Sequence, residues 1–354
     1  GTILISEYNN QTDKSYVYLY DLYNSEKKNY LILNGQVFKL DVNLNFGIVA
    51  ASFSNHTITL FNIKNGKVIQ VLNNHNYFIN DIGFNKLGNR FASCAMDSTF
   101  CMYSISSKGA EILFEIRTNS DKLNTLNFSD DMLAVGGFNR TVLVYNIKRQ
   151  ELLFSTKGLA KKPMSIRTNS DNRTLLSTWD ASIINEFNST NGQILNTYLS
   201  SEISSPPIYN NKCTEFSVTC RNGQSKIYSV GVFNPESITK ENSNAQNSSS
   251  FSNDNRFLVT TSGSFENLNT ENSVTVINRD GGDVVRHFRT KGISRSANFN
   301  CDDSQIIISS GSKTVIYDVK HNLIKNSLIH GKSGVIFSGY FNECTEIIIS
   351  CEDG

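Results

Sequence analysis

Short apolar strands alternate with polar turns along the whole chain, and the pattern repeats at a nearly constant interval. One strand in each interval carries an aromatic or apolar residue at an equivalent position. These residues are Tyr20, Phe61, Tyr103, Tyr145, Phe187, Tyr228, Ile277 and Tyr317. The steps between them are 41, 42, 42, 42, 41, 49 and 40 residues. A period of about 40 residues built from short strands is typical of arrays of four-stranded sheets.

Polar reversals recur with the same period. Examples are Asn85 to Asn89, Asn169 to Arg173 and Asn300 to Ser304. Asn, Asp, Ser and Gly favour tight turns because they bond to their own backbone or tolerate positive φ. The chain has only four prolines and no long stretch with helical spacing of apolar residues. The pattern therefore predicts an all-β protein.

The stretch from Leu72 to Ser106 shows the repeat most clearly. His75 lies in its entry loop, Ser93 in its second strand, Asp97 in a tight turn and Tyr103 in its third strand. This order resembles the WD40 repeat, which forms one four-stranded blade of a β-propeller. The resemblance implies a WD40-type β-propeller of four-stranded blades.

The resemblance also implies a buried hydrogen-bond network of His75, Ser93, Asp97 and Tyr103. Buried polar groups are tolerated when they bond to one another. Tyr103 stands where the family has tryptophan, so a phenol replaces the indole donor or the network is shorter. A Ser–His–Asp catalytic triad is the alternative, but no nucleophile-elbow sequence surrounds Ser93.

The number of blades follows from counting strands. Eight third strands are present, and we expect residues 1–354 to form a single propeller, with eight blades favoured. The first strand at Val335 to Phe341 is expected to complete the N-terminal blade, with the second strand duplicated by Ile347 to Cys351. Seven blades, or part of a tandem propeller, are the alternatives. Residues 200–255 are expected to form a divergent blade with a polar loop.

Composition narrows the classes of partner and chemistry. The 354 residues carry 33 Lys and Arg against 32 Asp and Glu, a formal charge of +1, so overall charge predicts neither DNA nor an anionic membrane as a partner. The apolar runs are too short to span a bilayer. The seven cysteines favour reduced, buried thiols. We expect an intracellular protein, cytoplasmic or nuclear.

Candidate binding residues are expected next to the turn that follows each second strand, because propellers bind through loops at one end. These are Met96, Phe138, Arg140 and Trp179, the only tryptophan. Aromatic side chains and arginine dominate binding energy at protein interfaces. The alternative for Trp179 is packing between blades.

The favoured function is a non-catalytic scaffold for other proteins, as a subunit of a multiprotein or ribonucleoprotein complex. Neither a glycine loop that cradles phosphate, nor a CxxC or HExxH pattern, nor paired carboxylates at a strand end occurs, so we expect no cofactor, no metal site and no catalysis. RNA contact would be a peripheral role, because Lys161, Lys162, Arg167 and Arg173 are dispersed and lack interleaved aromatics.

The alternative function is a phosphoinositide-binding propeller at a membrane surface. The stretch His287 to Gly292 resembles the paired-arginine signature of such propellers, with the second arginine absent and one residue inserted. Arg289 and Lys291 are the two cations that could hold a phosphate.

Overall fold

The computed structural model describes residues 2–9, 11–21, 26–119, 122–129, 131–156, 162–169, 174–179, 182–200, 203, 205–231, 235–240, 246–263, 272–279, 282–329, 335–341 and 346–351. The chain divides into two compact units. The first comprises Gly1–Leu33 and Ser200–Gly354, and the second comprises Asn34–Leu199. All regular structure in the described residues is β-strand, as the alternation of apolar strands and polar turns predicts.

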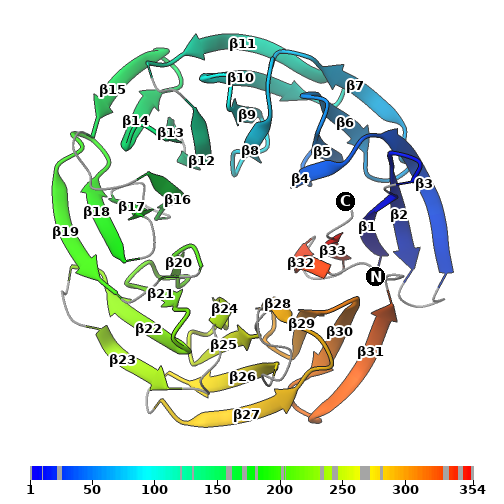
Figure 1. The fold of residues 1–354 in the computed structure, drawn as a ribbon, viewed down its shortest axis with the longest axis vertical. Coiled ribbons are helices and arrows are strands. Elements are labelled where there is room, and N and C mark those ends of the chain that lie inside the picture. The colour runs from blue at the N-terminus through cyan, green and yellow to red at the C-terminus, as the bar shows by residue number, and fades with distance from the viewer. Residues whose placement is uncertain are drawn as a thin grey trace. The chain divides into compact units, whose positions relative to one another are not determined.

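The second unit consists of four antiparallel sheets, each built from four strands that follow one another in the chain (Figure 1). The sheets are β4 (Val37–Asn43), β5 (Ile48–Phe53), β6 (Ile58–Asn62), β7 (Val68–Leu72); β8 (Ile79–Phe84), β9 (Arg90–Ala95), β10 (Thr99–Ser106), β11 (Gly109–Arg117); β12 (Leu123–Ser129), β13 (Met132–Gly137), β14 (Thr141–Asn146), β15 (Glu151–Ser155); and β16 (Pro163–Thr168), β17 (Thr174–Trp179), β18 (Ile183–Asn188), β19 (Ile194–Leu199). The first strands β4, β8, β12 and β16 contact one another in sequence.

The first unit contains three sheets of the same kind and a fourth sheet that joins the two ends of the chain. The three are β20 (Ile208–Tyr209), β21 (Glu215–Thr219), β22 (Gln224–Ser229), β23 (Pro235–Lys240); β24 (Gln246–Phe251), β25 (Phe257–Ser262), β26 (Ser273–Asn278), β27 (Val284–Arg289); and β28 (Ser294–Phe299), β29 (Gln305–Ser310), β30 (Lys313–Asp318), β31 (Leu323–Ile329).

The terminal sheet differs from the arrangement that the sequence predicts. It has five strands in the order β3 (Glu26–Asn34), β2 (Lys14–Asp21), β1 (Thr2–Asn9), β33 (Glu346–Cys351), β32 (Val335–Phe341). The duplicated second strand is present, but β33 lies between β32 and β1, so β32 does not pair with the N-terminal strands. β1 pairs with β33 in parallel. The other edge of β1 pairs with β2, and the other edge of β33 pairs with β32, both in antiparallel hairpins.

The polar segment within residues 200–255 is more regular than its composition predicts. Residues 246–251, expected as part of a polar loop, form β24, the first strand of its sheet. Ser249 bonds to Ser217 at 2.9 Å, and Ser248 bonds to Thr261 at 2.9 Å. Hydroxyl pairs between neighbouring strands satisfy these side chains, so a strand forms without an apolar pattern.

Asparagines explain part of how consecutive sheets are held together. The register of the first strand shifts by one residue at a bulge in most sheets, β20 being an exception, and in three sheets the bulged residue is asparagine. Its amide donates to the first residue of the next sheet: Asn80 to Leu123 O at 2.6 Å, Asn124 to Pro163 O at 3.0 Å and Asn247 to Ser294 O at 2.8 Å. A bulge re-aims a side chain, here toward a carbonyl of the neighbouring sheet.

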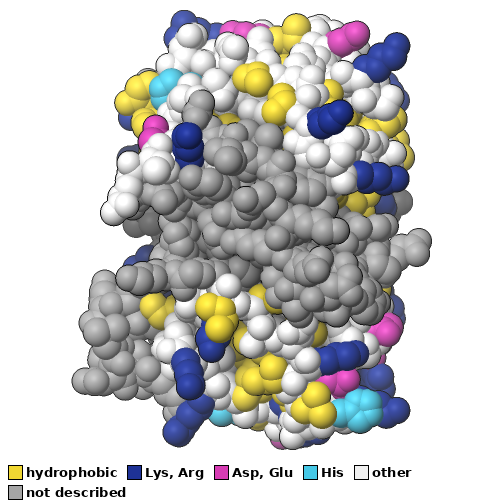
Figure 2. Space-filling model, turned by 90° about the vertical axis from the view of Figure 1, so that its right-hand side faces the viewer, with side chains coloured by type: hydrophobic (Ala, Val, Ile, Leu, Met, Phe, Trp, Pro, Cys, Tyr) yellow, Lys and Arg dark blue, Asp and Glu magenta, His cyan; other side chains and the backbone are white. Residues whose placement is uncertain are grey.

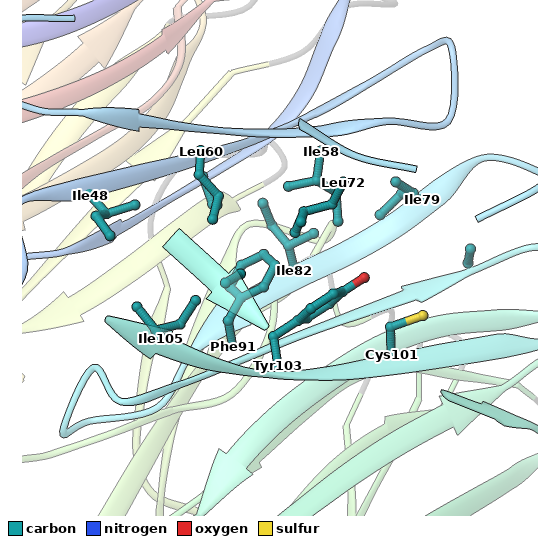
Figure 3. Packing of buried hydrophobic residues seen from close by; sticks show 13 residues of the cluster. Ile48, Ile58, Leu60, Leu72, Ile79, Ile82, Phe91, Cys101, Tyr103 and Ile105 are labelled. Atoms are coloured by element: carbon teal, nitrogen blue, oxygen red, sulfur yellow. The ribbon is translucent and has the colours of Figure 1, made fainter. Parts of the chain in front are cut away.

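Apolar side chains fill the space between neighbouring sheets. Figure 3 shows the layer between β4–β7 and β8–β11, where Ile58 and Leu60 of β6 lie opposite Phe91 and Tyr103. The Phe91 side chain is fully buried, and its ring lies 4.7 Å from the Phe84 ring and 5.7 Å from the Tyr103 ring. Residues expected at the third-strand position therefore supply the core, because each sheet buries both faces.

The fourth strands form the outer edge of the sheets and carry exposed apolar residues. In six sheets, the fourth-strand residue that pairs with the third-strand aromatic or apolar residue is itself apolar and 44–64 % exposed. These six residues are Val68, Ile112, Leu152, Ile194, Val284 and Ile324. On the face drawn in Figure 2, hydrophobic side chains lie among single lysine and arginine side chains. Single exposed apolar residues of this kind are normal on folded proteins.

Candidate interaction site

The His75 network assembles around the turn between β9 and β10. His75 lies in the loop before β8, Ser93 in β9 and Asp97 in the turn. The His75 Nε2 atom lies 2.7 Å from Ser93 Oγ, and Nδ1 lies 3.2 Å from Asp97 Oδ2 and 3.0 Å from Thr99 Oγ1. Thr99, which begins β10, is a member that the resemblance did not imply.

The hydrogen-bond partners define the direction of each bond. Ionised Asp97 only accepts, and Thr99 Oγ1 donates to Asp97 Oδ1 at 2.5 Å. His75 Nδ1 must therefore carry a proton, and in the neutral ring Nε2 accepts from Ser93. Burial opposes ionisation of Asp97, but bonds from His75, Thr99 and the Asn76 N–H outweigh it and hold the pKa of Asp97 well below its ordinary value.

Tyr103 lies next to this network, where its hydroxyl interacts with the Ser93 side chain. Its side chain is 1 % exposed within the apolar layer of Figure 3, and its hydroxyl donates to Asn74 Oδ1 at 3.1 Å. Burial, together with the nearby Cys101, raises the pKa of the Tyr103 phenol well above its ordinary value. The phenol therefore fixes the loop before His75 through Asn74, a residue that the sequence pattern did not single out.

The contacts of His75 have the order of a serine-protease triad, but their surroundings differ. Ser93 is fully buried, and the His75 and Asp97 side chains are only 1 % and 6 % exposed. A catalytic serine must reach a substrate carbonyl. Here the hydroxyl is enclosed by the protein, so this network stabilises the turn.

The binding residues expected from the sequence lie at or just after the ends of second strands in the second unit. Met96 is half-buried in the β9–β10 turn, where its N–H donates to Phe78 O at 2.8 Å. Phe138 is half-buried and Arg140 exposed in the β13–β14 turn. Trp179 ends β17, where its backbone pairs with Pro163 and Ile183; its side chain lies outside the described part of the chain.

The surroundings of Phe138 contain a second cation. The Nζ atom of Lys162, at the start of the β16 sheet, lies 4.4 Å from the centre of the Phe138 ring. Arg140 adopts φ +66° in the same turn. Lysine over a ring face is attracted by the ring's negative charge density, so this turn presents an aromatic ring together with cations.

An aromatic cluster that the sequence did not reveal lies beside Met96. Phe38 in β4, His56 in the β5–β6 turn, and Tyr77 and Phe78 before β8 pack ring against ring. The His56 and Tyr77 rings stack at 5.6 Å. Phe38 is 46 % exposed and Tyr77 is 47 % exposed. The adjacent aromatics Tyr77 and Phe78 in one loop were the only local signal of this cluster.

The two residues of the lipid alternative lie at the end of β27 in the first unit. Arg289 and Lys291 are both exposed. Between them, the Thr290 hydroxyl bonds to Gly292 O and Ser294 Oγ, each at 2.8 Å. A Cβ atom on Gly292 would lie 2.5 Å from Gly311 Cα. Close backbone packing therefore accounts for this glycine without a bound phosphate.

Two of the four residues considered for RNA contact lie in the described part of the chain, Lys162 and Arg167. Lys161 and Arg173 lie outside the described residues. Arg167 is half-buried and donates to Ile166 O of its own strand at 2.8 Å. Burial lowers the pKa of the Arg167 guanidinium. This arginine contributes to the interior more than to a nucleic-acid surface.

The described cysteines differ in disulfide bonding. Cys94, Cys101, Cys213 and Cys220 form no disulfide, whereas Cys301 is disulfide-bonded, which departs from the expectation that the cysteines are reduced. Burial raises the pKa of Cys101 to about 12, so this thiol is unreactive. Across the part of the chain that the structure describes, no group of three His, Cys, Asp or Glu could hold a metal ion, and no helix could span a membrane.

Comparisons with known proteins match one stretch of the sequence to a family model and the fold to solved structures. The family model described as "WD domain, G-beta repeat" matches residues 66–104, which include His75 and Asp97. No curated protein matches the chain in sequence. The computationally designed Ika8 protein matches in structure with a TM-score of 0.74 and 14 % identity, over 90 % of this chain and 94 % of that one. Sqt1 of Saccharomyces cerevisiae matches with a TM-score of 0.74 and 14 % identity, over 87 % and 89 %.

Proposed function

We propose that this chain, which carries a WD40 repeat at residues 66–104 and has the fold of a WD40-type β-propeller, is a divergent WD40-repeat protein and a non-catalytic platform that assembles other proteins, as a subunit of a multiprotein or ribonucleoprotein complex. WD40 domains generally bind other proteins. A rigid array of sheets holds its turns in fixed positions, so that binding specificity resides in the turn residues.

The observation that carries this proposal is the aromatic cluster of Phe38, His56, Tyr77 and Phe78. Two of its rings are nearly half exposed although the cluster is packed ring against ring. Pre-packed aromatic side chains lose little conformational entropy when a partner covers them, and they contribute strongly to binding. A protein partner gains most from such a surface.

The turns of the next two sheets extend this surface. Met96 is bonded through its backbone to Phe78, while Phe138 carries the Lys162 ammonium on its ring. Arg140 is exposed in the same turn as Phe138. Aromatic rings flanked by cations offer both apolar burial and charge-assisted hydrogen bonds to a partner.

The absence of catalysis is part of the proposal. His75, Ser93 and Asp97 have the connectivity of a catalytic triad, but they are buried in the described structure and cannot meet a substrate. Turnover of a substrate by the purified chain that is lost with Ser93→Ala would contradict this part of the proposal.

Affinity purification of the full-length protein from its native cells tests the platform function. Tyr77→Ala combined with Phe38→Ala removes the exposed rings, and Leu152→Ala, which is 48 % exposed on β15, is the matched control. We expect a stoichiometric set of co-purifying proteins that is lost with the double variant and retained with the control. Retention of the same set by both variants would exclude this cluster as the binding surface.

A further inference from the structure

Two neighbouring sheets of the second unit end in hairpin turns with an unusual composition. The turns comprise residues 43–47, 62–67, 85–90 and 105–109. They contain Lys64, Lys67, Lys86, Arg90 and Lys108, and no Asp or Glu. The whole chain is nearly balanced, with 33 basic and 32 acidic residues. Positive charge is therefore concentrated locally.

Hydrogen bonds hold these turns side by side. Asn45 Nδ2 donates to Leu87 O at 2.7 Å, and Asn43 Nδ2 donates to Gly88 O at 2.6 Å, across the two sheets. Within the first sheet, the Ile63 N–H donates to Gly47 O at 2.8 Å. Within the second, the Ile105 N–H donates to Asn89 O at 3.1 Å. The four turns thus form one surface, which we call the hairpin patch.

The hairpin patch also exposes three large apolar side chains. Leu44 is 46 % exposed, Phe46 is 37 % exposed and Leu87 is 64 % exposed. All three occupy reversing turns, and the Asn45–Leu87 bond places the two turns next to each other. Exposure of apolar residues at turn tips costs free energy, which is recovered when a partner covers them.

The cations of the hairpin patch carry no carboxylate partner in the part of the chain that the structure describes. The ion pairs found there involve none of the five. The corresponding turns of the next sheet differ, because there Lys148 pairs with Asp131 at 2.8 Å and Arg149 pairs with Glu151 at 3.3 Å. The positive field of the hairpin patch is therefore available to an anionic partner.

We propose that the hairpin patch docks the protein on an anionic phospholipid bilayer. Leu44, Phe46 and Leu87 enter the boundary between headgroups and acyl chains, and the surrounding lysines contact the phosphates. Lysine suits this role because its long apolar stem can follow the inserted residues while its ammonium stays among the headgroups.

The composition of the hairpin patch favours an anionic bilayer over two other anionic partners, single-stranded nucleic acid and an acidic peptide. Single-stranded nucleic acid is bound by stacking on aromatic rings, whereas two of the three apolar residues here are leucines. An acidic peptide is typically held in a groove or along a sheet edge, whereas these apolar residues lie on turn tips. A bilayer requires only that apolar tips and cations share one face.

Vesicle flotation with the full chain tests the proposal. The probes are vesicles of phosphatidylcholine alone and of phosphatidylcholine with phosphatidylserine. We expect binding only with phosphatidylserine, weakened by salt. Lys64→Ala with Lys86→Ala should weaken binding about 25-fold, at about fivefold for each cation near an anionic surface. Phe46→Ser with Leu87→Ser should also release the protein from the vesicles.

Two control variants show whether binding depends on the hairpin patch itself. Arg289→Ala with Lys291→Ala should leave binding to phosphatidylserine vesicles unchanged, because those residues lie outside the hairpin patch. Leu152→Ser is the control for Phe46→Ser and Leu87→Ser, because Leu152 is an exposed apolar residue on a different sheet. Failure to float with phosphatidylserine would overturn the proposal, as would flotation that is insensitive to Phe46 and Leu87. Lysine-dependent binding of RNA or an acidic peptide without vesicle binding would overturn it too and assign the patch to that partner.

Discussion

Asp41 Oδ2 accepts a hydrogen bond of 2.6 Å from the backbone N–H of Phe84, which lies in the first strand of the next sheet. Burial, and more weakly the charge of Asp81, raises the pKa of Asp41 to about 6, although bonds from the Phe84 and Val42 N–H groups lower it. The carboxylate that links two sheets is therefore partly protonated in mildly acidic solution.

Asp41→Asn is expected to change how stability depends on pH. The folded protein binds the Asp41 proton more tightly than the unfolded chain, so this residue favours folding most below pH 3.8, and the benefit is lost as the pH rises through 6. Asparagine keeps an acceptor for Phe84 and does not titrate. The stability of the variant relative to the wild type should therefore increase by up to about 3 kcal/mol between about pH 4 and about pH 7.5. Urea unfolding at both values measures the difference, and a pH-independent difference would refute it.

Asp97→Ala is expected to destabilise the protein by about 1–3 kcal/mol at neutral pH, because it leaves buried donors of His75 and Thr99 without an acceptor. The pKa of Asp97 is lowered in the folded state. Its contribution is therefore complete above the ordinary carboxyl pKa of about 3.9 and declines as the pH falls below that value. Urea unfolding of both proteins at neutral pH tests the size of the effect. An unchanged midpoint would show that the network does not stabilise the fold.

Asn80→Ala removes the side-chain amide that joins the bulge of β8 to Leu123 O. We expect a loss of about 1 kcal/mol, the usual net value of one hydrogen bond. Asn119→Ala is the control, because Asn119 is exposed in the loop after β11. Equal unfolding midpoints for the two variants would show that the bulge asparagine adds nothing between sheets.

Gly88→Ala is expected to cost more than backbone strain alone. Gly88 has φ +70°, and a Cβ atom there would overlap the Asn43 side chain. Gly282 has φ +69°, but a Cβ atom on it would meet no other atom within 4 Å. Gly282→Ala therefore reports the cost of positive φ, about 1–2 kcal/mol. A larger loss at Gly88, measured by thermal or urea unfolding, would establish the close contact between the two hairpins. Equal losses would argue against it.

The order of residues within one repeat was sufficient to predict much of the candidate site. His75, Ser93 and Asp97 were identified from the resemblance to the repeat, and the turn with its two strands fixes where each side chain lies. Thr99 and Asn74 were missed although they are close in sequence. Their membership depends on rotamers and on the direction of each hydrogen bond, which spacing does not specify.

The aromatic cluster and the hairpin patch could not be predicted in the same way. Phe38 and Phe78 are 40 positions apart in the chain, and Asn45 and Leu87 are 42 apart. Each pair meets only because one sheet stacks on the next. The polar strand β24 was missed for a related reason, since its hydroxyl partners come from other strands.

The sequence by itself determined the all-β class, the repeat of about 40 residues and the positions of the third strands, because strand alternation and turn chemistry are local properties. The tertiary structure alone decided that β33 enters the terminal sheet beside β1, which asparagines join neighbouring sheets, and which exposed side chains share a surface. Those features depend on contacts between segments far apart in the chain, and their free energy arises only when the sheets pack.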